Sequence, residues 1–261
     1  MAERTPSYVV MFSGGIASAY LAHLVIEREG RDNTVLFFTD TLWEDEDNYR
    51  FMREVSEHLH LPITYQADGR TPKQVFWDRR LLKRHDTAPC STELKMKQTV
   101  IYVETQRTKG IEPILYFGIE RTEAQRAPRL EHNYSHNCLE AVECRFPLID
   151  LGVSKSDMLR IIEQEWGIRK PRMYELGFDH ANCGGRCVKA GGQHYRNLLR
   201  VWPERFAEVE DMERRFNEEI NTYTLLRRKR KPYTLRELRE AVEAQVEIEF
   251  EDENMPCTCI F

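Results

Sequence analysis

The sequence predicts an α/β fold in which a doubly wound parallel sheet is followed by a C-terminal helical subdomain that contains cysteines. Short apolar runs alternate with amphipathic stretches over residues 1–170, a pattern typical of parallel sheets. After residue 170 this alternation gives way to a glycine-rich loop and strongly charged helices. We therefore expect two regions, an α/β domain at 1–170 and a helical subdomain at 171–261.

Each expected element follows from a run of this kind. The chain contains four apolar runs with strand character and a shorter edge strand, at 8–12, 35–38, 62–65, 114–117 and 146–149. Between and after them, helical patterns cover 19–25, 44–60, 72–82, 94–108, 154–166, 204–223 and 235–244, with Ser154 as an N-cap. Ligands of such sheets bind outside the carboxyl ends of the strands.

Composition narrows the classes of protein that fit. No apolar run in the 261 residues approaches the length of a membrane span, and the first residues lack the pattern of a secretory signal. A net charge of −5 argues against a protein that coats nucleic acid non-specifically, while a local basic patch remains open. Seven cysteines, an odd number, favour metal, cluster or thiol chemistry over disulfides, so we expect a cytoplasmic protein without a membrane partner.

The connection after the first apolar run is a candidate phosphate-binding site. Ser13-Gly14-Gly15 ends the run and a helix begins at once. Unpaired backbone N–H groups are therefore expected at the positive end of the helix dipole, where an anion can bind. No Gly-Lys-Ser/Thr follows, and the Rossmann glycine pattern is absent. With Ser18, the segment resembles the PP-loop of the ATP pyrophosphatase superfamily, the adenine nucleotide alpha hydrolases. The resemblance implies a HUP-like fold and an ATP site at Ser13, Gly14, Gly15, Ile16, Ala17 and Ser18.

The segment after the second strand narrows this resemblance. Thr39-Asp40-Thr41 followed by an acidic stretch is similar to the phosphoadenosine-phosphosulfate (PAPS) reductase-like branch of the superfamily. The resemblance implies that Thr39, Asp40 and Thr41 face the nucleotide and that Asp40 holds Mg²⁺ or meets the ribose or adenine. The acidic residues after Asp40 have a second interpretation, as a helix N-terminus that satisfies its own dipole.

Further segments follow in the order of that branch. They contain Cys90 and Lys95, the stretch from Gly118 to Arg126, Pro147-Leu148-Ile149-Asp150, and Cys183. The resemblance places Gly118 and Glu123 at the nucleotide. Lys95, Arg121 and Arg126 are candidate catalytic clamps for phosphate or sulfate oxygens, although each alone also fits an ordinary surface residue.

The cysteines form a second signal. Cys183 and Cys187 flank a glycine turn, and Cys90, Cys257 and Cys259 complete a candidate metal set. Three interpretations remain open: an iron–sulfur cluster of the 4Fe-4S type, a structural zinc, and redox-active thiols. The spacing departs from that of cluster-containing sulfonucleotide reductases, because the upstream pair is a single Cys90. Cluster-free PAPS reductases carry a nucleophilic cysteine on a C-terminal segment, a role open to Cys257 and Cys259. We expect Cys138 and Cys144 to be structural.

The resemblance implies an enzyme that cleaves ATP, with Mg²⁺, to AMP and pyrophosphate and adenylates a substrate for sulfur incorporation. The acceptor is a nucleic acid (tRNA or DNA) or a nucleoside, and a sulfur donor is needed. Ala17 stands where many pyrophosphate-releasing members have Asp. This departure supports one alternative, a sulfonucleotide reductase or sulfotransferase. The other alternative is a non-catalytic nucleotide-binding module.

The basic residues 227–231 fit a nucleic-acid contact or a solvated helix end, and a homodimer remains open.

Overall fold

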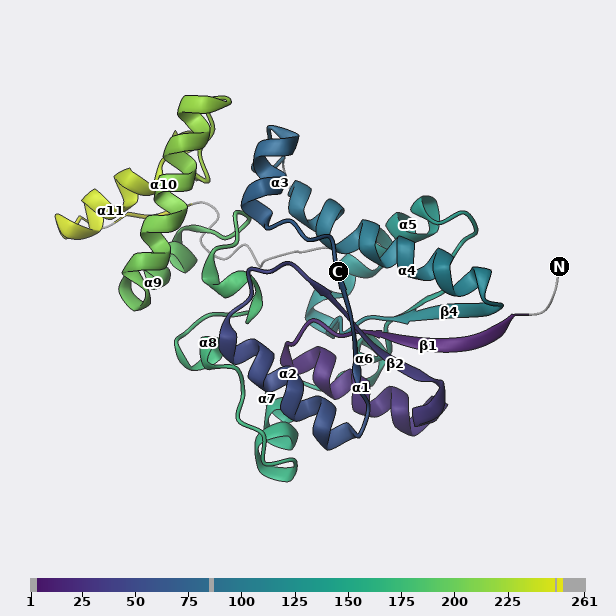
Figure 1. Cartoon of the computed structure of the whole chain (residues 1–261). Helices are drawn as coiled ribbons and strands as arrows, with labels where there is room; N and C mark the ends of the chain where they lie inside the picture. The colour runs from purple at the N-terminus through teal and green to yellow at the C-terminus, as the bar shows by residue number, and fades with distance from the viewer. Residues whose placement is uncertain (1–3, 85–86, 247, 251–261) are drawn as a thin grey trace.

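The main sheet of the protein has five parallel strands in the order β3-β2-β1-β4-β5 (Figure 1). The computed structural model describes residues 4–84, 87–246 and 248–250. The strands are β1 Thr5–Met11, β2 Thr34–Asp40, β3 Ile63–Ala67, β4 Ile111–Tyr116 and β5 Cys144–Arg145. The predicted α/β class with a doubly wound parallel sheet is therefore confirmed.

Alternate residues of each strand enter opposite cores because successive side chains of a strand point to opposite faces. Val10, Leu36 and Phe38 pack in one hydrophobic cluster with helices α1 and α2, whereas Val9 and Phe37 pack in another with α4 and α5. Figure 1 shows α1, α2 and α7 on one side of the sheet and α4 and α5 on the other. Both faces are covered, which explains why the strands read as continuous apolar runs.

The helices lie close to their predicted positions. A π-helical turn, Ser91–Met96, leads into α4, and Ile161–Glu165 extends α7. Ser154 caps α7 through a reciprocal pair of bonds with Asp157, as predicted. The helices are α1 Ile16–Glu29, α2 Glu46–Leu59, α3 Pro72–Arg79, α4 Lys97–Thr108, α5 Ala127–Asn137, α6 Pro147–Leu151, α7 Lys155–Arg160, α8 Arg172–Glu175, α9 Gly192–Val201, α10 Pro203–Glu219 and α11 Leu235–Glu243.

The predicted edge strand at 146–149 is wrong. The fifth strand contains only Cys144 and Arg145, and Pro147 begins α6. Proline suits the first position of a helix because its missing N–H has no partner there in any case. The apolar run Phe146-Pro147-Leu148-Ile149 therefore becomes a helical turn that follows the strand.

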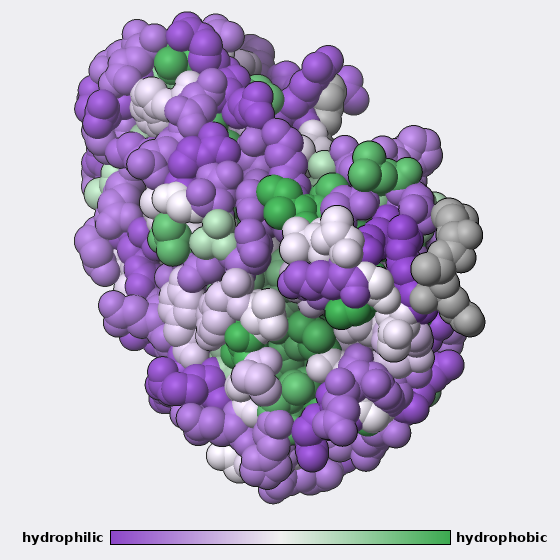
Figure 2. Space-filling model, turned by 45° about the vertical axis from the view of Figure 1, so that its right-hand side comes forward, coloured by the Kyte–Doolittle hydropathy of each residue, from purple (hydrophilic) through white to green (hydrophobic). Residues whose placement is uncertain are grey.

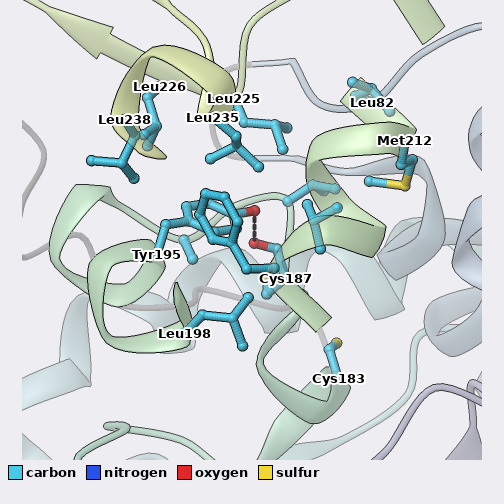
Figure 3. Close-up of a cluster of buried hydrophobic side chains, with 14 of the residues drawn as sticks. Leu82, Cys183, Cys187, Tyr195, Leu198, Met212, Leu225, Leu226, Leu235 and Leu238 are labelled. Atoms are coloured by element: carbon cyan, nitrogen blue, oxygen red, sulfur yellow. Dashed lines mark hydrogen bonds between the residues drawn. The ribbon is translucent and has the colours of Figure 1, made fainter. Parts of the chain in front are cut away.

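The C-terminal helices surround a core of their own. Tyr195, Met212 and Leu238 from α9, α10 and α11 pack with Leu82, which follows α3 (Figure 3). In Figure 1 these helices lie at one end of the molecule, next to α3. This part of the chain is thus anchored on the segment between β3 and α4.

The basic residues 227–231 form a hairpin and not a helix end, which corrects one of the two interpretations of this run. Strands β6 Leu226–Arg228 and β7 Lys231–Tyr233 pair antiparallel, and Lys229 and Arg230 adopt positive φ in the turn. The buried Glu213 of α10 holds the hairpin at both ends. Its carboxylate accepts bonds from the N–H groups of Leu225 (2.6 Å) and Leu235 (2.7 Å), while burial raises the pKa of Glu213 to about 7.

The surface seen in Figure 2 is largely hydrophilic, with hydrophobic side chains gathered across the middle of that face. Among the described residues, no helix combines the length and the apolar character needed to cross a membrane.

Candidate functional site

A polar cavity lies where the direction of strand order changes. The chain runs from β1 through β2 to β3 on one side of the sheet, and β4 then returns to the other side of β1. Ligands of open α/β sheets bind at such a switch point, outside the carboxyl ends of the two central strands. The cavity, here called the phosphate cavity, measures about 240 Å³. Its lining is Met11, Ser13, Gly15, Ile16, Ala17, Ser18, Gly118, Glu120, Thr122, Glu123, Arg126, Lys155, Tyr174, His180 and Asn182.

The loop after β1 is shaped to present backbone N–H groups. Gly14 has a φ of +76°, and Ser18 Oγ donates to the carbonyl of Gly15 at 2.9 Å. Gly15 is the N-cap of α1 and has no side chain to accept from the N–H groups of the first turn. These N–H groups and the helix dipole favour an anion at this position.

Tyr174 already meets one of these N–H groups. Its hydroxyl accepts a hydrogen bond from the backbone of Ile16, which lowers the pKa, but burial outweighs this and raises the pKa of Tyr174 to about 12. A neutral phenol therefore lies against the loop over the whole physiological pH range. An anion that binds the loop would replace or extend this contact.

Gly118 lets the loop after β4 approach the first turn of α1. A Cβ at this position would lie 3.0 Å from the backbone nitrogen of Ser18 and 3.1 Å from the carbonyl carbon of Ala17. Any larger residue would therefore push the two loops apart. The close approach brings the segment that follows Gly118 onto the phosphate cavity.

Charged groups of both signs line the cavity. Arg126 pairs with Glu123 at 2.5 Å, and Lys155 lies on the same lining. Burial raises the pKa of Glu120, with a smaller opposing effect from the Lys155 ammonium. The cavity thus combines two cations, which suit phosphate oxygens, with two carboxylates, which suit a hard divalent cation.

Asn48 lies behind the loop. Its side-chain amide is buried, and neither its nitrogen nor its oxygen has a hydrogen-bond partner in the described part of the chain. A Cβ on Gly14 would come within 2.7 Å of this nitrogen. Asn48 therefore limits how far the glycine turn can move toward α2.

The structure brings most of the predicted nucleotide residues together. Ser13, Gly15, Ile16, Ala17, Ser18, Gly118, Glu123 and Arg126 line the phosphate cavity, and Gly14 forms the turn between two of them.

Five other predicted residues lie outside this lining: Thr39, Asp40, Arg121, and also Thr41 and Lys95, which line a second pocket. Thr39 and Asp40 end β2, where Asp40 accepts bonds from Leu42 N–H (2.8 Å) and the Tyr49 hydroxyl (2.7 Å). Arg121 is exposed and donates to the carbonyls of Ile149 and Asp150.

Three predicted cysteines gather in a second, much smaller pocket, here called the thiol pocket. Its volume is about 10 Å³, and it is lined by Thr41, Trp43, Pro72, Phe76, Ala88, Cys90, Ser91, Lys95, Cys183, Arg186, Cys187, Val188 and Lys189. Figure 3 shows Cys183 and Cys187 on the loop before α9, where Tyr195 donates to the Cys187 carbonyl at 2.8 Å. The predicted Lys95 and Thr41 therefore belong to the thiols and not to the phosphate cavity.

Within the described ranges, no three His, Cys, Asp or Glu side chains are placed to hold a metal ion. Cys257 and Cys259 lie outside the described residues. A metal ion or cluster at the thiol pocket would thus need ligands beyond those that the structure places there, or a rearrangement of Cys90, Cys183 and Cys187. We therefore derive no reaction step through such a group.

The acidic turn at residues 44–47 serves the fold. Asp45 is the N-cap of α2 and is paired with Arg172 and Arg205, each at 2.8 Å. Glu44 accepts from the backbone N–H of Cys183 at 2.6 Å, so it positions the cysteine loop. These contacts favour the helix N-terminus interpretation and leave Asp45 without a lining position in the phosphate cavity.

Asp47 continues the same pattern. It pairs with Arg50 and Arg169 and accepts from the backbone N–H of Arg172 at 2.7 Å. Hydrogen bonds from Arg50 lower the pKa of Asp47 to about 2, against an opposing effect of burial. Asp47 is therefore charged at every pH at which the protein is expected to work.

Seven residues of the cavity lining had no predicted binding role: Met11, Glu120, Thr122, Lys155, Tyr174, His180 and Asn182. Glu120 and Thr122 lie within the predicted stretch from Gly118 to Arg126, and His180 and Asn182 lie just before Cys183, so their positions carried a usable signal. Tyr174 and Lys155 come from separate helices, and nothing in their local sequence marks them.

Cys138 and Cys144 are part of the core on one face of the sheet. Burial raises the pKa of Cys138 to about 11 and that of Cys144 to about 12. Thiols that stay protonated are poor nucleophiles and poor metal ligands, which fits the structural role predicted for both.

Comparison with known proteins bears on the domain that contains the phosphate loop. Residues 7–109, from β1 to α4, match the family model of the phosphoadenosine phosphosulfate reductase domain. This segment is thus similar to the PAPS reductase domain. The predicted resemblance to the PAPS reductase-like branch is thereby confirmed, and the matched segment contributes the Ser13–Ser18 side of the phosphate cavity.

Among solved structures, the chain is similar to the U34-tRNA thiolase NcsA from Methanococcus maripaludis with its 4Fe-4S cluster. The two chains are 15% identical, the match covers 94% of this chain and 83% of that one, and the TM-score is 0.36. No curated protein matches the sequence.

Proposed function

We propose that the protein is an enzyme that cleaves ATP to AMP and pyrophosphate in order to activate an acceptor for sulfur incorporation. In this reaction an acceptor oxygen attacks the α-phosphorus, pyrophosphate leaves, and a sulfur nucleophile then displaces AMP from the adenylated acceptor. The observation that carries the proposal is the phosphate cavity itself, where loop N–H groups, Arg126 and Lys155 converge at the switch point of a sheet whose first part is similar to the PAPS reductase domain.

The same cavity contains groups that suit Mg²⁺. Ala17 removes the carboxylate that many pyrophosphate-releasing relatives have in this loop, but Glu120 and Glu123 bring two carboxylates to the lining from the neighbouring segment. Mg²⁺ in nucleotide enzymes is commonly held by one or two carboxylates together with phosphate oxygens. We propose that Glu120 and Glu123 hold it, and that its charge would stabilise the leaving pyrophosphate.

The thiol pocket supports the sulfur-transfer half of the proposal. Asn182 lines the phosphate cavity and the next residue, Cys183, lines the thiol pocket, so the two sites are joined through a single peptide bond. Lys95, Arg186 and Lys189 also line the thiol pocket, and cations of this kind favour a thiolate. We propose that Cys90, Cys183 and Cys187 accept sulfur from a sulfane-sulfur donor as a persulfide, whose outer sulfur displaces AMP. A second cysteine then releases the thiolated acceptor by forming a disulfide with the first, and Cys257 and Cys259 are further candidates for these roles.

Ala17 also favours a second candidate, a sulfonucleotide reductase or sulfotransferase, because such enzymes do not release pyrophosphate. The two proposals differ in their products. Sulfite from a sulfonucleotide would support the second candidate, whereas AMP and pyrophosphate from ATP support the first. Tight ATP binding without either product would identify a non-catalytic module.

A charge-removal variant tests the role of the cavity in this reaction. We expect Arg126→Gln to weaken ATP binding about 10- to 100-fold, because a charge-assisted bond to phosphate contributes about 1.5–3 kcal/mol. Arg121→Gln is the matched control, since Arg121 lies five residues earlier and is bonded to carbonyls outside the lining. Equilibrium binding and the release of AMP and pyrophosphate are measured for both. Equal losses in the two variants would contradict the proposed site.

A second variant tests the metal set. If iron or zinc is bound at the thiol pocket, we expect Cys183→Ala to remove it and Cys138→Ala to retain it, because Cys183 lines that pocket and Cys138 does not. Metal analysis of anaerobically purified protein, together with the visible absorption of an iron–sulfur cluster, distinguishes the two metals. Retention of metal by Cys183→Ala would exclude the predicted ligand set.

A further inference from the structure

Two basic segments, far apart in the sequence, lie side by side at the C-terminal end of the molecule. Leu82 packs in one cluster with Leu225 and Leu226 (Figure 3), and Lys83 Nζ donates to the carbonyl of Leu225 at 2.7 Å. Arg84 follows the first contact point and Arg227 follows the second. The residues that continue from these points therefore share one side of the protein. We call the exposed cations of these two segments the basic surface: Arg80, Arg84, Arg227, Lys229, Arg230 and Lys231.

These six cations differ from most arginines of the chain. None of them forms an ion pair with a carboxylate in the part of the chain that the structure describes. Arg214, Arg215, Arg236 and Arg239, on the neighbouring helices α10 and α11, are instead each paired with a glutamate. In a protein of net charge −5, a cluster of unneutralised cations is a specific feature and not a consequence of composition.

The hairpin is built to keep its cations extended into solvent. Both ends are fixed on the buried Glu213, and the turn residues Lys229 and Arg230 adopt positive φ. A rigid support lowers the entropy that such side chains lose when they bind a polyanion. Exposed cations on such a ribbon are able to contact the phosphates of a nucleic-acid backbone.

The basic surface leads directly to the thiol pocket. Arg84 and Thr87 exchange backbone hydrogen bonds of 2.8 and 3.0 Å, which holds Thr87 next to Arg84, and Ala88 and Cys90 line the pocket. Leu82 also shares its hydrophobic cluster with Cys183 and Cys187. A backbone held on the basic surface would therefore have its neighbouring bases close to the proposed sulfur-transfer residues.

We infer that the basic surface binds the phosphate backbone of an RNA and presents an unpaired loop of that RNA to the thiol pocket. A base must leave its stack before an enzyme can act on it, which is least costly in a single-stranded loop. Sequence-specific RNA contacts are commonly made to such loops, and the hairpin offers no helix of the kind that enters the major groove of DNA. The inference deepens the proposed function by naming the acceptor class, and only the position of the reacting base rests on that function.

The test measures binding of a labelled RNA stem-loop to the full chain. We expect the triple variant Lys229→Gln, Arg230→Gln, Lys231→Gln to bind at least about tenfold more weakly at about 0.1 M salt. The slope of log K against log salt should fall by about 2–3, because each lost phosphate contact lowers it by about one. The double variant Arg80→Gln, Arg84→Gln should act in the same direction and show that both segments contribute.

The matched control removes the same number of positive charges from paired arginines on the same subdomain, as Arg214→Gln, Arg215→Gln, Arg236→Gln. We expect this variant to bind RNA within about twofold of the unaltered protein, because the glutamate partners and not phosphates hold these arginines. An equal loss in control and test variants would overturn the inference. Equal affinity for a DNA stem-loop of the same sequence would overturn the choice of RNA.

ATP turnover separates this inference from the proposed function. The triple variant should bind ATP as the unaltered protein does, because none of its altered residues lines the phosphate cavity. RNA binding that depends on the basic surface without AMP release would leave the inference standing and contradict the proposed reaction. If AMP release neither requires nor responds to an RNA stem-loop, and the variants bind RNA as the unaltered protein does, the proposed reaction stands and the inference is contradicted.

Discussion

Replacing Asp45 with alanine is expected to lower the free energy of unfolding by about 3–5 kcal/mol, the usual cost of removing one partner from a buried ion pair. Asp45 is only 1% exposed, and its carboxylate accepts two bonds from Arg172 and is paired with Arg205, all at 2.8 Å. It also caps α2 through the backbone N–H of Asp47. The substitution therefore removes a helix cap and leaves two arginines without their shared carboxylate.

Chemical unfolding of three variants measures the effect. Asp45→Asn keeps an acceptor for the N-cap bond but loses the charge, so its stability should lie between those of Asp45→Ala and the unaltered protein. Asp211→Ala is the control, because Asp211 forms an exposed ion pair with Arg214 and should contribute less than about 1 kcal/mol. A cost for Asp45→Ala no larger than that of Asp211→Ala would contradict the structural role of the acidic turn.

The same contacts fix the direction of a pH effect. Burial raises the pKa of Asp45, but hydrogen bonds from Arg172 and Arg205 outweigh it and hold the pKa below its ordinary value of 3.8. A carboxyl with a lowered pKa in the folded state contributes stability above its unfolded value, and this contribution is lost as the pH falls. The difference in stability between Asp45→Asn and the unaltered protein should therefore shrink below about pH 4.

Gly14→Ala is expected to weaken ATP binding at least about 100-fold, because the phosphate loop cannot keep its shape around a Cβ. Gly14 has a φ of +76°, and the added atom would lie 2.7 Å from Asn48 Nδ2 and 2.9 Å from Met52 Cγ. Both neighbours are buried on α2, so the loop must move instead. Movement of the loop would turn its N–H groups away from the phosphates.

Two alanine variants separate the contributions to this effect. Gly69→Ala adds a Cβ at a φ of +94° with no atom within 4 Å, so it measures the cost of positive φ without a clash and should leave ATP affinity unchanged. Gly15→Ala is on the loop itself, but its Cβ would meet the Tyr174 hydroxyl at 3.3 Å and its φ of −90° is ordinary. Equilibrium ATP binding is measured for all three. If Gly14→Ala kept the ATP affinity of the unaltered protein, the loop would not be the nucleotide-binding site.

Local sequence patterns were enough to predict the central strands of the sheet. They failed where an apolar run is compatible with both a strand and the start of a helix. The apolar runs that became β1 and β2 are buried on both faces, so they could be recognised without knowing their partners. Phe146-Pro147-Leu148-Ile149 has the same composition, but its proline suits a helix start as well as an edge strand. Local sequence does not decide between the two, because pairing of β5 with β4 stops at Arg145.

The candidate site shows the same division. The loop from Ser13 to Ser18 is continuous in sequence, so its role could be predicted from its own residues. Tyr174 and Lys155 reach the phosphate cavity only because α7 and α8 fold back onto it, which no local pattern encodes. The role of the acidic turn was equally hidden, since Arg172, which pairs with Asp45, lies 127 residues further along the chain.

The contacts of the acidic turn have a consequence for how this protein can be recombined. Glu44 and Asp45 belong to the part of the chain that forms the sheet, yet their partners, the Cys183 backbone and Arg205, belong to the C-terminal part, which contains the cysteine loop and the basic hairpin. A chimera that exchanges the C-terminal part alone would leave two buried carboxylates without their matched donors. The acidic turn and the cysteine loop should therefore be inherited as a pair, with a change in one requiring a compensating change in the other.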